Sequence, residues 1–225
     1  MLNLYAKLQE SPLFTGLTSD NIAQIIGQTK FSFSKFQPKE IIKREGELCR
    51  NLTFLISGHA KMVSFADDYG YSVEEDVSAP LILQPERLFG LTQRYTKTFC
   101  AESECDTMSI DKNDMMRLID DFFVVRINLL NIISTISQKN ARLAWRHTSD
   151  DDMQRITRFF KQHVCLPYGR KTIRIKMTRL ALETNQSRLA VSKELNRLKE
   201  DGLLTFSRGI IEIPAFERIG KEQIS

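Results

Sequence analysis

Long apolar runs are missing from this sequence of 225 residues, although 42% of its residues are hydrophobic. No uninterrupted apolar stretch approaches the ~20 residues that a membrane-spanning helix requires. The first ten residues also lack the basic-then-apolar layout of a secretory signal. The sequence therefore predicts a cytoplasmic protein without a membrane partner.

Cysteine and histidine are too scattered to form a recognisable metal site. The four cysteines are Cys49, Cys100, Cys105 and Cys165. None precedes residue 49 and no Cys-x-x-Cys pair occurs, whereas an iron–sulfur cluster needs grouped thiolates. Reduced thiols are therefore expected, with no iron–sulfur cluster and no other metal centre. His59 follows a predicted turn, but one histidine does not make a haem site.

Catalytic motifs are also missing. The sequence contains no glycine-rich phosphate loop, no metal-ligand cluster and no nucleophile beside a base. These absences argue against an enzyme.

Charge is distributed unevenly along the chain, although the net charge is only +4. Residues 153–225 carry 15 Lys and Arg against 7 Asp and Glu, whereas residues 1–152 carry 17 against 21. A basic C-terminal part behind an acidic N-terminal part is typical of a nucleic-acid-binding domain attached to a sensor.

The segment from Thr178 to Leu204 predicts two short helices around a tight turn. Asn185 lies where the turn needs a left-handed residue, a conformation that asparagine tolerates well. Ser187 is a good N-cap for the second helix, which we expect to cover residues 187–201. Val191, Leu195 and Leu198 share one apolar face of that helix, because they are spaced at i, i+4 and i+7.

A second face of this helix is polar and basic. It carries Arg188, Leu189, Ser192, Lys193 and Asn196. Arg188 lies in the first turn, where the helix dipole disfavours a cation unless an external anion is bound. The pattern fits a helix that enters DNA, and it also fits an ordinary amphipathic helix with a solvated basic face.

The residues after this helix favour DNA binding. Gly202 ends the helix, and two short β-rich segments then meet at Arg208-Gly209, as in a hairpin. Together these features resemble the Crp/Fnr family of bacterial winged-helix transcription regulators. The residues that carry the resemblance are Ser187-Arg188, Val191-Ser192-Lys193, Leu195, Leu198, Gly202-Leu203 and Arg208-Gly209.

This resemblance implies a homodimer that binds double-stranded DNA at an inverted repeat, with RNA polymerase as a further partner. The implied DNA-binding residues are Ser187, Arg188, Leu189, Ser192, Lys193, Asn196, Arg208 and Gly209. The family commonly has Glu after the recognition arginine, whereas this chain has Leu189. Leucine can pack on a thymine methyl but accepts no hydrogen bond, so we expect an altered half-site at that position.

The N-terminal part is predicted to be β-rich. Phe31, Phe33 and Phe36 alternate with polar residues, and Gly46, Gly58 and others punctuate short runs. The phrases Glu45-Gly46-Glu47 and Leu52 to Gly58 resemble the double-stranded β-helix of cyclic-nucleotide-binding domains. The expected α+β architecture is a β-roll sensor at residues 1–118, a dimerisation helix and hinge at 119–148, and a winged helix-turn-helix domain at 149–225.

The candidate effector pocket departs from the family pattern. Its residues are Phe89, Gly90, Leu91, Arg94, Tyr95, Thr96 and Lys97. Leu91 stands where the family has its ribose-binding Glu, and Tyr95 lies near the position of its phosphate-binding Arg. Arg94 or Lys97 would have to supply the missing charge, or else be solvated loop residues. Burying an unpaired phosphate costs several kcal/mol, so the sequence argues against cyclic AMP and leaves the effector unidentified.

A long helix is expected to join the two domains, because residues 119–146 contain neither Gly nor Pro. The predicted dimer seam is a repeat of seven residues formed by Phe122, Leu129, Ile136 and Leu143, with Val125 and Ile132 three places after the first two. A flanking stripe, Phe123, Leu130 and Ile133, is also apolar. One side could then pack on the β-domain and the other on a second subunit, and packing on the chain's own domain alone is the alternative.

A different class of function remains open. The chain could be an effector-binding module whose DNA domain is secondary, such as an anti-regulator titrated by a ligand. That hypothesis predicts tight binding of a small molecule without any shift of DNA.

Overall fold

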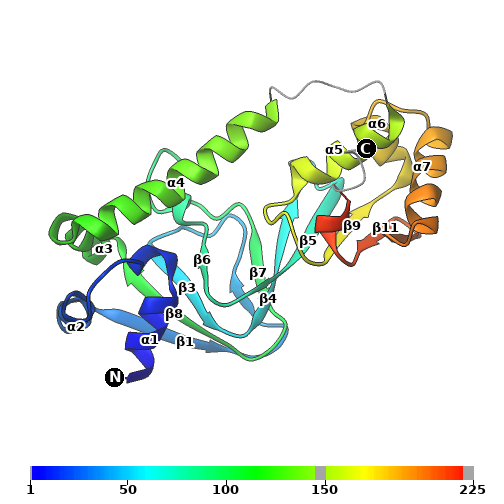
Figure 1. The fold of residues 1–225 in the computed structure, drawn as a ribbon. Coiled ribbons are helices and arrows are strands. Elements are labelled where there is room, and N and C mark those ends of the chain that lie inside the picture. Colours follow the sequence, from blue (N-terminus) through cyan, green and yellow to red (C-terminus); the bar gives the residue numbers. More distant parts are fainter. Residues whose placement is uncertain (1, 145–150, 220–225) are drawn as a thin grey trace. The chain divides into compact units, whose positions relative to one another are not determined.

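The computed structural model describes residues 2–144 and 151–219, which belong to two compact units (Figure 1). The first unit combines Met1–Ala60 with Val77–Ala144, and the second combines Lys61–Asp76 with Trp145–Ser225. This grouping differs from the division at residues 118 and 148 that the sequence suggests. A segment from the middle of the β-rich part belongs to the second unit.

The first unit contains a β-roll with helices before and after it. Its elements are α1 (Leu2–Glu10), η1 (Pro12–Phe14), α2 (Ser19–Gln28), β1 (Phe31–Phe36), β2 (Ile41–Lys43), β3 (Asn51–Ser57), β6 (Leu81–Leu83), η2 (Pro85–Arg87), β7 (Thr98–Ala101), β8 (Cys105–Asp111), α3 (Lys112–Asp121) and α4 (Phe123–Ala144). Thr18 caps α2 by accepting a hydrogen bond from the Asn21 amide at 3.2 Å.

Strands β1, β8, β3 and β6 form an antiparallel sheet in that order. Leu52 and Leu55 of β3 and Met108 and Ile110 of β8 are buried in the core of this unit. The phenylalanine alternation correctly predicted β1. It did not predict burial, because Phe33 is exposed opposite Met108 at the edge of the sheet.

The long helix expected from the sequence is interrupted at Phe122. That residue has an extended conformation between α3 and α4. The Arg126 guanidinium donates to the carbonyls of Ile119 at 2.6 Å and Asp120 at 3.1 Å. These carbonyls lie at the end of α3 and have no partner within that helix, so Arg126 satisfies them and stabilises the break. No glycine or proline is needed, which explains why composition did not reveal it.

The described residues of the second unit include the α-helices α5 (Asp152–His163), α6 (Met177–Glu183) and α7 (Arg188–Glu200). Its sheet has the order β10-β11-β9-β5, from β10 (Thr205–Ser207), β11 (Ile210–Ile213), β9 (Lys171–Ile175) and β5 (Tyr71–Ser78). Strand β5 forms a hairpin with β4 (His59–Phe65), and η3 (Phe216–Arg218) follows β11. Buried side chains from α5, α6, α7 and the sheet form one core, which includes Ile156, Phe160, Ile173 and Leu195.

Helix α5 begins at Asp152, about one turn after residue 149, where the winged helix-turn-helix domain is expected to start. Asp151 is its N-cap and accepts hydrogen bonds from the amides of Met153 at 2.7 Å and Gln154 at 3.2 Å. The end of the dimerisation helix and hinge expected at 119–148 falls in residues 145–150, outside the described part of the chain. Within the described residues, no helix is long and apolar enough to cross a membrane.

Candidate nucleic-acid interface

Helix α7 begins where its sequence predicts. The Ser187 hydroxyl accepts a hydrogen bond from the Ala190 amide at 3.0 Å, so Ser187 is the N-cap. Val191, Leu195 and Leu198 are buried in the core of the second unit. Gly202, with a φ of +68°, ends the helix, and the Leu203 amide donates back to the Leu198 carbonyl at 2.9 Å. Both ends and the inward face are therefore fixed by local chemistry.

The turn between α6 and α7 has the left-handed residue expected from the sequence, because Asn185 has a φ of +52°. The Gln186 amide donates to the Ala181 carbonyl at 2.9 Å, which closes the end of α6. Two side-chain bonds hold this turn against α5. The Arg155 guanidinium donates to the Asn185 carbonyl at 3.0 Å, and the Gln186 side chain donates to the Asp152 carbonyl at 2.9 Å. The turn before α7 is thus bonded to both α6 and α5, which fixes where α7 begins.

The outward face of α7 carries the predicted contact residues. Arg188, Leu189, Lys193 and Asn196 are exposed, and Ser192 is half-buried. Leu189 is 81% exposed, which leaves a large apolar side chain in water near the start of the helix. The Asn196 side chain donates to the Ser192 carbonyl at 2.9 Å. Ser187 is exposed as well, but its hydroxyl already accepts the capping hydrogen bond.

The predicted hairpin after α7 is present as β10 and β11, which pair from Thr205↔Glu212 to Ser207↔Ile210. Its two-residue turn is Arg208-Gly209, with φ values of +47° and +82°. Two positive φ values are typical of the turn that matches the natural twist of a β-hairpin. A Cβ on Gly209 would make an ordinary contact, 3.4 Å from the Ile175 carbonyl oxygen, so the positive φ rather than lack of space favours glycine here.

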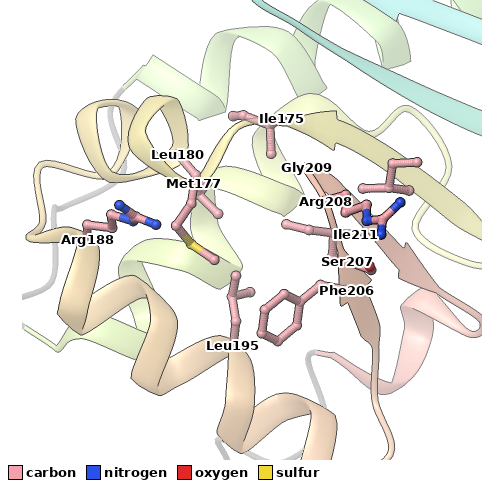
Figure 2. A pocket seen from close by; sticks show the side chains of 11 residues that line it. Ile175, Met177, Leu180, Arg188, Leu195, Phe206, Ser207, Arg208, Gly209 and Ile211 are labelled. Atoms are coloured by element: carbon pink, nitrogen blue, oxygen red, sulfur yellow. The ribbon is translucent and has the colours of Figure 1, made fainter.

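A cavity of about 310 Å³ lies between α7, α6 and this hairpin. Figure 2 shows Arg188 and Arg208 on opposite sides of it, with Met177, Leu195 and Phe206 between them. The surface between the two arginines is therefore mainly apolar. Two exposed cations at either side of a shallow apolar surface can hold a polyanion whose charges are spaced apart.

The charges of this unit fall into two groups. Arg174 is paired with Glu74, Arg179 with Asp68 and Glu183, and Arg170 with Glu212. By contrast, Arg188, Lys193 and Arg208 form no ion pair with any residue that the structure describes. Exposed positive charge without an ion pair among the described residues thus lies on α7 and the hairpin tip, and also at Lys176 and Arg218.

Lys176 is a further candidate that the sequence interpretation missed. It is exposed at the N-terminus of α6, and its Cα lies 3.9 Å from the position of a Cβ on Gly209. No ion pair with a described residue is recorded for it. The pairing of β9 with β11 brings Lys176 beside the hairpin tip. Its position along the chain therefore did not indicate that it belongs to this surface.

The predicted effector residues are not gathered around one cavity. Leu91 is fully exposed, whereas Tyr95 is 1% exposed and packs into the β-roll. The Tyr95 hydroxyl lies 3.5 Å from the Thr53 hydroxyl, and burial raises the Tyr95 pKa, which keeps the phenol neutral. Tyr95 therefore fills interior space that a ligand would need, and it offers no positive charge to a phosphate.

The residues next to Tyr95 form hydrogen bonds with other parts of the first unit. Arg94 donates to the Gly46 carbonyl at 2.6 Å. Thr96 exchanges two hydrogen bonds with the Gln84 side chain, at 2.7 and 3.0 Å. Phe89 is half-buried beneath the Lys112 ammonium, Gly90 is exposed and Lys97 is half-buried. These contacts do not provide the ribose and phosphate partners that a cyclic nucleotide would need.

The predicted dimer seam needs correction on α4. Phe122, Val125 and Leu129 are buried within the first unit, where α4 packs on η1. Asn128 donates to the carbonyls of Leu13 at 3.0 Å and Thr15 at 2.8 Å, which fixes this face inward. The first half of the seam is therefore unavailable to a partner.

Further along α4, Ile132 and Ile136 are half-buried, and Leu143 has a side chain outside the described part. The exposed apolar stripe consists instead of Phe123, Ile127 and Leu130, which are 67%, 37% and 53% exposed. These residues are spaced at i, i+4 and i+7 and share one face. Phe123 and Leu130 of the flanking stripe thus face solvent together with Ile127, whereas Ile133 is half-buried like Ile132 and Ile136.

Comparison with known proteins agrees with the β-roll. Residues 33–122 match the family model of the cyclic nucleotide-binding domain. A comparison with curated protein sequences gives no match.

Among solved structures, the chain is similar to the catabolite activator protein of Thermus thermophilus, with 18% identity and a TM-score of 0.45 over 93% of this chain and 96% of that one. It is also similar to the c-di-GMP-responsive global regulator CLP of Xanthomonas campestris, with 17% identity and a TM-score of 0.46 over 88% and 99%. DNR of Pseudomonas aeruginosa matches with 19% identity and a TM-score of 0.44 over 95% of each chain.

Proposed function

We propose that this protein is a homodimeric, sequence-specific DNA-binding transcription regulator of the Crp/Fnr type, with a C-terminal winged helix-turn-helix domain. The observation that carries the proposal is the group of exposed cations without ion pairs among the described residues, Arg188 and Lys193 on α7 and Arg208 at the hairpin tip. Phosphates would supply the anions that these groups lack.

In this proposal α7 is the recognition helix and lies in the major groove. Arg188 meets O6 and N7 of a guanine with its two-pronged guanidinium, and Leu189 packs on a thymine methyl. Ser192, Lys193 and Asn196, farther along the same face, contact an adjacent base or phosphate. The hydroxyl of Ser187 serves the helix as its cap, so its contribution to DNA binding is positional.

The hairpin formed by β10 and β11 is the wing. Arg208 and the Gly209 backbone lie against a phosphate chain, and Lys176 adds a second positive group beside Arg208. Backbone contacts of this kind contribute affinity and register without reading sequence.

Dimerisation would use the exposed face of α4, with Phe123, Ile127 and Leu130 covered by the same residues of a second copy. Two-fold symmetry would then present one recognition helix to each of two successive major grooves, ~34 Å apart. The expected operator is an inverted repeat. Because Tyr95 occupies the interior of the β-roll, cyclic AMP is not the proposed effector.

Selection of tight-binding sequences from random double-stranded DNA tests this function directly. We expect an inverted repeat whose half-site contains guanine at the Arg188 position and an adjacent A·T pair, read through Leu189. Retention of a cytosine contact at the Leu189 position would contradict the role given to that residue. If no DNA is enriched while a small molecule binds tightly, the chain is an effector-binding module instead.

Replacing Arg208 by alanine is expected to weaken binding to all DNA sequences by a similar factor. A phosphate contact carries no base information, and its loss should lower the slope of log affinity against log salt by about one. Fluorescence anisotropy at several salt concentrations measures both quantities. Arg170→Ala is the matched control, because that exposed arginine is already paired with Glu212. A change in base preference for Arg208→Ala would contradict the assignment.

A further inference from the structure

The segment Lys61–Asp76 is a structural part of the unit proposed to bind DNA. Five consecutive residues of β5 pair with β9, from Tyr71↔Ile175 to Glu75↔Lys171. Val73 is fully buried in the core formed by α5, α6, α7 and the sheet, and Tyr71 packs against the same core. Because the matched cyclic nucleotide-binding domain spans residues 33–122, part of that domain is also a strand of the other unit's sheet.

A buried ion pair fixes the register of this strand. The side chains of Glu75 and Lys171 are both 0% exposed, and their Oε2 and Nζ atoms are 3.1 Å apart. The Glu75 carboxylate also accepts hydrogen bonds from the amides of Cys165 at 2.8 Å and Leu166 at 2.9 Å. A slip of one residue would turn Glu75 away and leave Lys171 charged and unpaired in the interior, which is strongly unfavourable.

Further contacts hold the other end of the hairpin. Asp68 pairs with Arg179 of α6 at 2.9 Å, and the Arg179 guanidinium lies over the Tyr71 ring. The Tyr71 hydroxyl lies 2.8 Å from Nε2 of His163 on α5. The segment is therefore attached to both helices that support α7.

Hydrogen bonds continue from this strand to the wing. Strand β9 lies between β5 and β11, so Ser72, Arg174 and Ile210 form one row across three strands, and Glu75, Lys171 and Ile213 form another. Next to the first row, the Ile175 amide donates to the Gly209 carbonyl at 2.8 Å, immediately beside Arg208. The position of the wing tip thus depends on β9, which pairs with β5 along its other edge.

We propose that Lys61–Asp76 positions the wing for DNA, with Glu75 and Lys171 as the positioning residues. This inference rests on the proposed DNA-binding function and adds the residues that set the position of the wing.

The test compares the intact dimeric protein and its variants on the selected inverted-repeat DNA by fluorescence anisotropy. Glu75→Gln should weaken binding about tenfold and lower the salt slope by about one, as expected for losing the wing's phosphate contact. On an Arg208→Ala background the same change should cost less than about twofold, because the contact it acts through is already gone. The double variant Glu75→Gln/Lys171→Met removes the unpaired charge and should restore binding to within about threefold of the original protein.

Asp76→Asn is the matched control, since Asp76 is the exposed neighbour of Glu75 and the change removes the same charge. Its binding should match that of the unaltered protein. Equal losses from Glu75→Gln with and without Arg208, or no loss at all, would overturn the positioning role.

Hydrogen exchange of the unaltered protein provides a second measurement. It needs no DNA, and it does not depend on whether any variant folds. The paired amides of β5 and β11 should show similar protection, because they open together. Exchange in β5 that is at least about 100-fold faster than in β11 would show that the wing does not depend on this strand. Failure to bind any DNA, with matched exchange rates, would refute the proposed function while leaving the structural coupling intact.

Discussion

Replacing Arg188 by alanine is expected to reduce discrimination between the selected operator and a variant altered at the guanine position by ~1–3 kcal/mol. Arg188 is exposed in the first turn of α7 and has no ion pair among the described residues. A guanidinium that donates to both O6 and N7 rejects other bases because they cannot accept both hydrogen bonds. Competition binding with matched pairs of DNA sequences measures the difference.

Arg197→Ala provides the control for Arg188. Arg197 has the same charge on the same helix, is exposed, and lies near Glu194 with an N–O distance of 4.0 Å. It is nine residues from Arg188 and so occupies the opposite side of the helix. We expect its removal to leave base preference unchanged. If Arg188→Ala instead weakens every sequence equally, Arg188 contacts phosphate and another residue reads the base.

Introducing aspartate at both Phe123 and Leu130 is expected to convert the dimer to a monomer. These side chains are exposed in the isolated chain, so the change should leave the fold of the first unit intact. In the dimer it would bury two carboxylates per subunit without partners. Losing one of two linked half-site contacts should weaken operator binding by at least about 100-fold. Light scattering measures the oligomeric state, and titration with operator DNA measures the affinity.

Thr135→Asp with Asn140→Asp adds the same number of carboxylates to exposed positions of α4 that lie off this stripe. That variant should remain dimeric. Aspartate at Leu129 is a different case, because Leu129 is buried and the change should unfold the first unit rather than separate subunits. A Phe123 and Leu130 variant that stays dimeric would place the interface elsewhere.

Local chemistry explains which features could be predicted from the sequence. The cap at Ser187, the left-handed turn at Asn185 and the Arg208-Gly209 hairpin each depend on residues within a few positions. The inward face of α7 is predictable in the same way, since three apolar residues at helical spacing must be buried together. Helical spacing therefore placed the proposed contact residues of α7 on its outward face before any tertiary information, and their contact with DNA stays a prediction.

Features that depend on distant parts of the chain were not predictable. The two apolar stripes of α4 have similar composition, and only the packing of Val125 and Leu129 on η1 shows which one is left exposed. The break at Phe122 depends on Arg126 reaching back to the end of α3. Likewise, the effector segment looked contiguous in sequence, but the β-roll buries Tyr95 and leaves Leu91 in water.

Neighbouring residues were sufficient to specify the local elements of the proposed DNA-binding part, because caps, turns and helical periodicity act over a few positions. Long-range packing was needed to place Glu75 against Lys171, 96 positions away, and to join Lys61–Asp76 to the second unit. Lys171 alternates with Ile173 and Ile175 on the buried face of β9, where nothing nearby in sequence indicates a partner for its charge. The pairing of β5 with β9 supplies that partner, since strand pairing brings together residues that are remote along the chain.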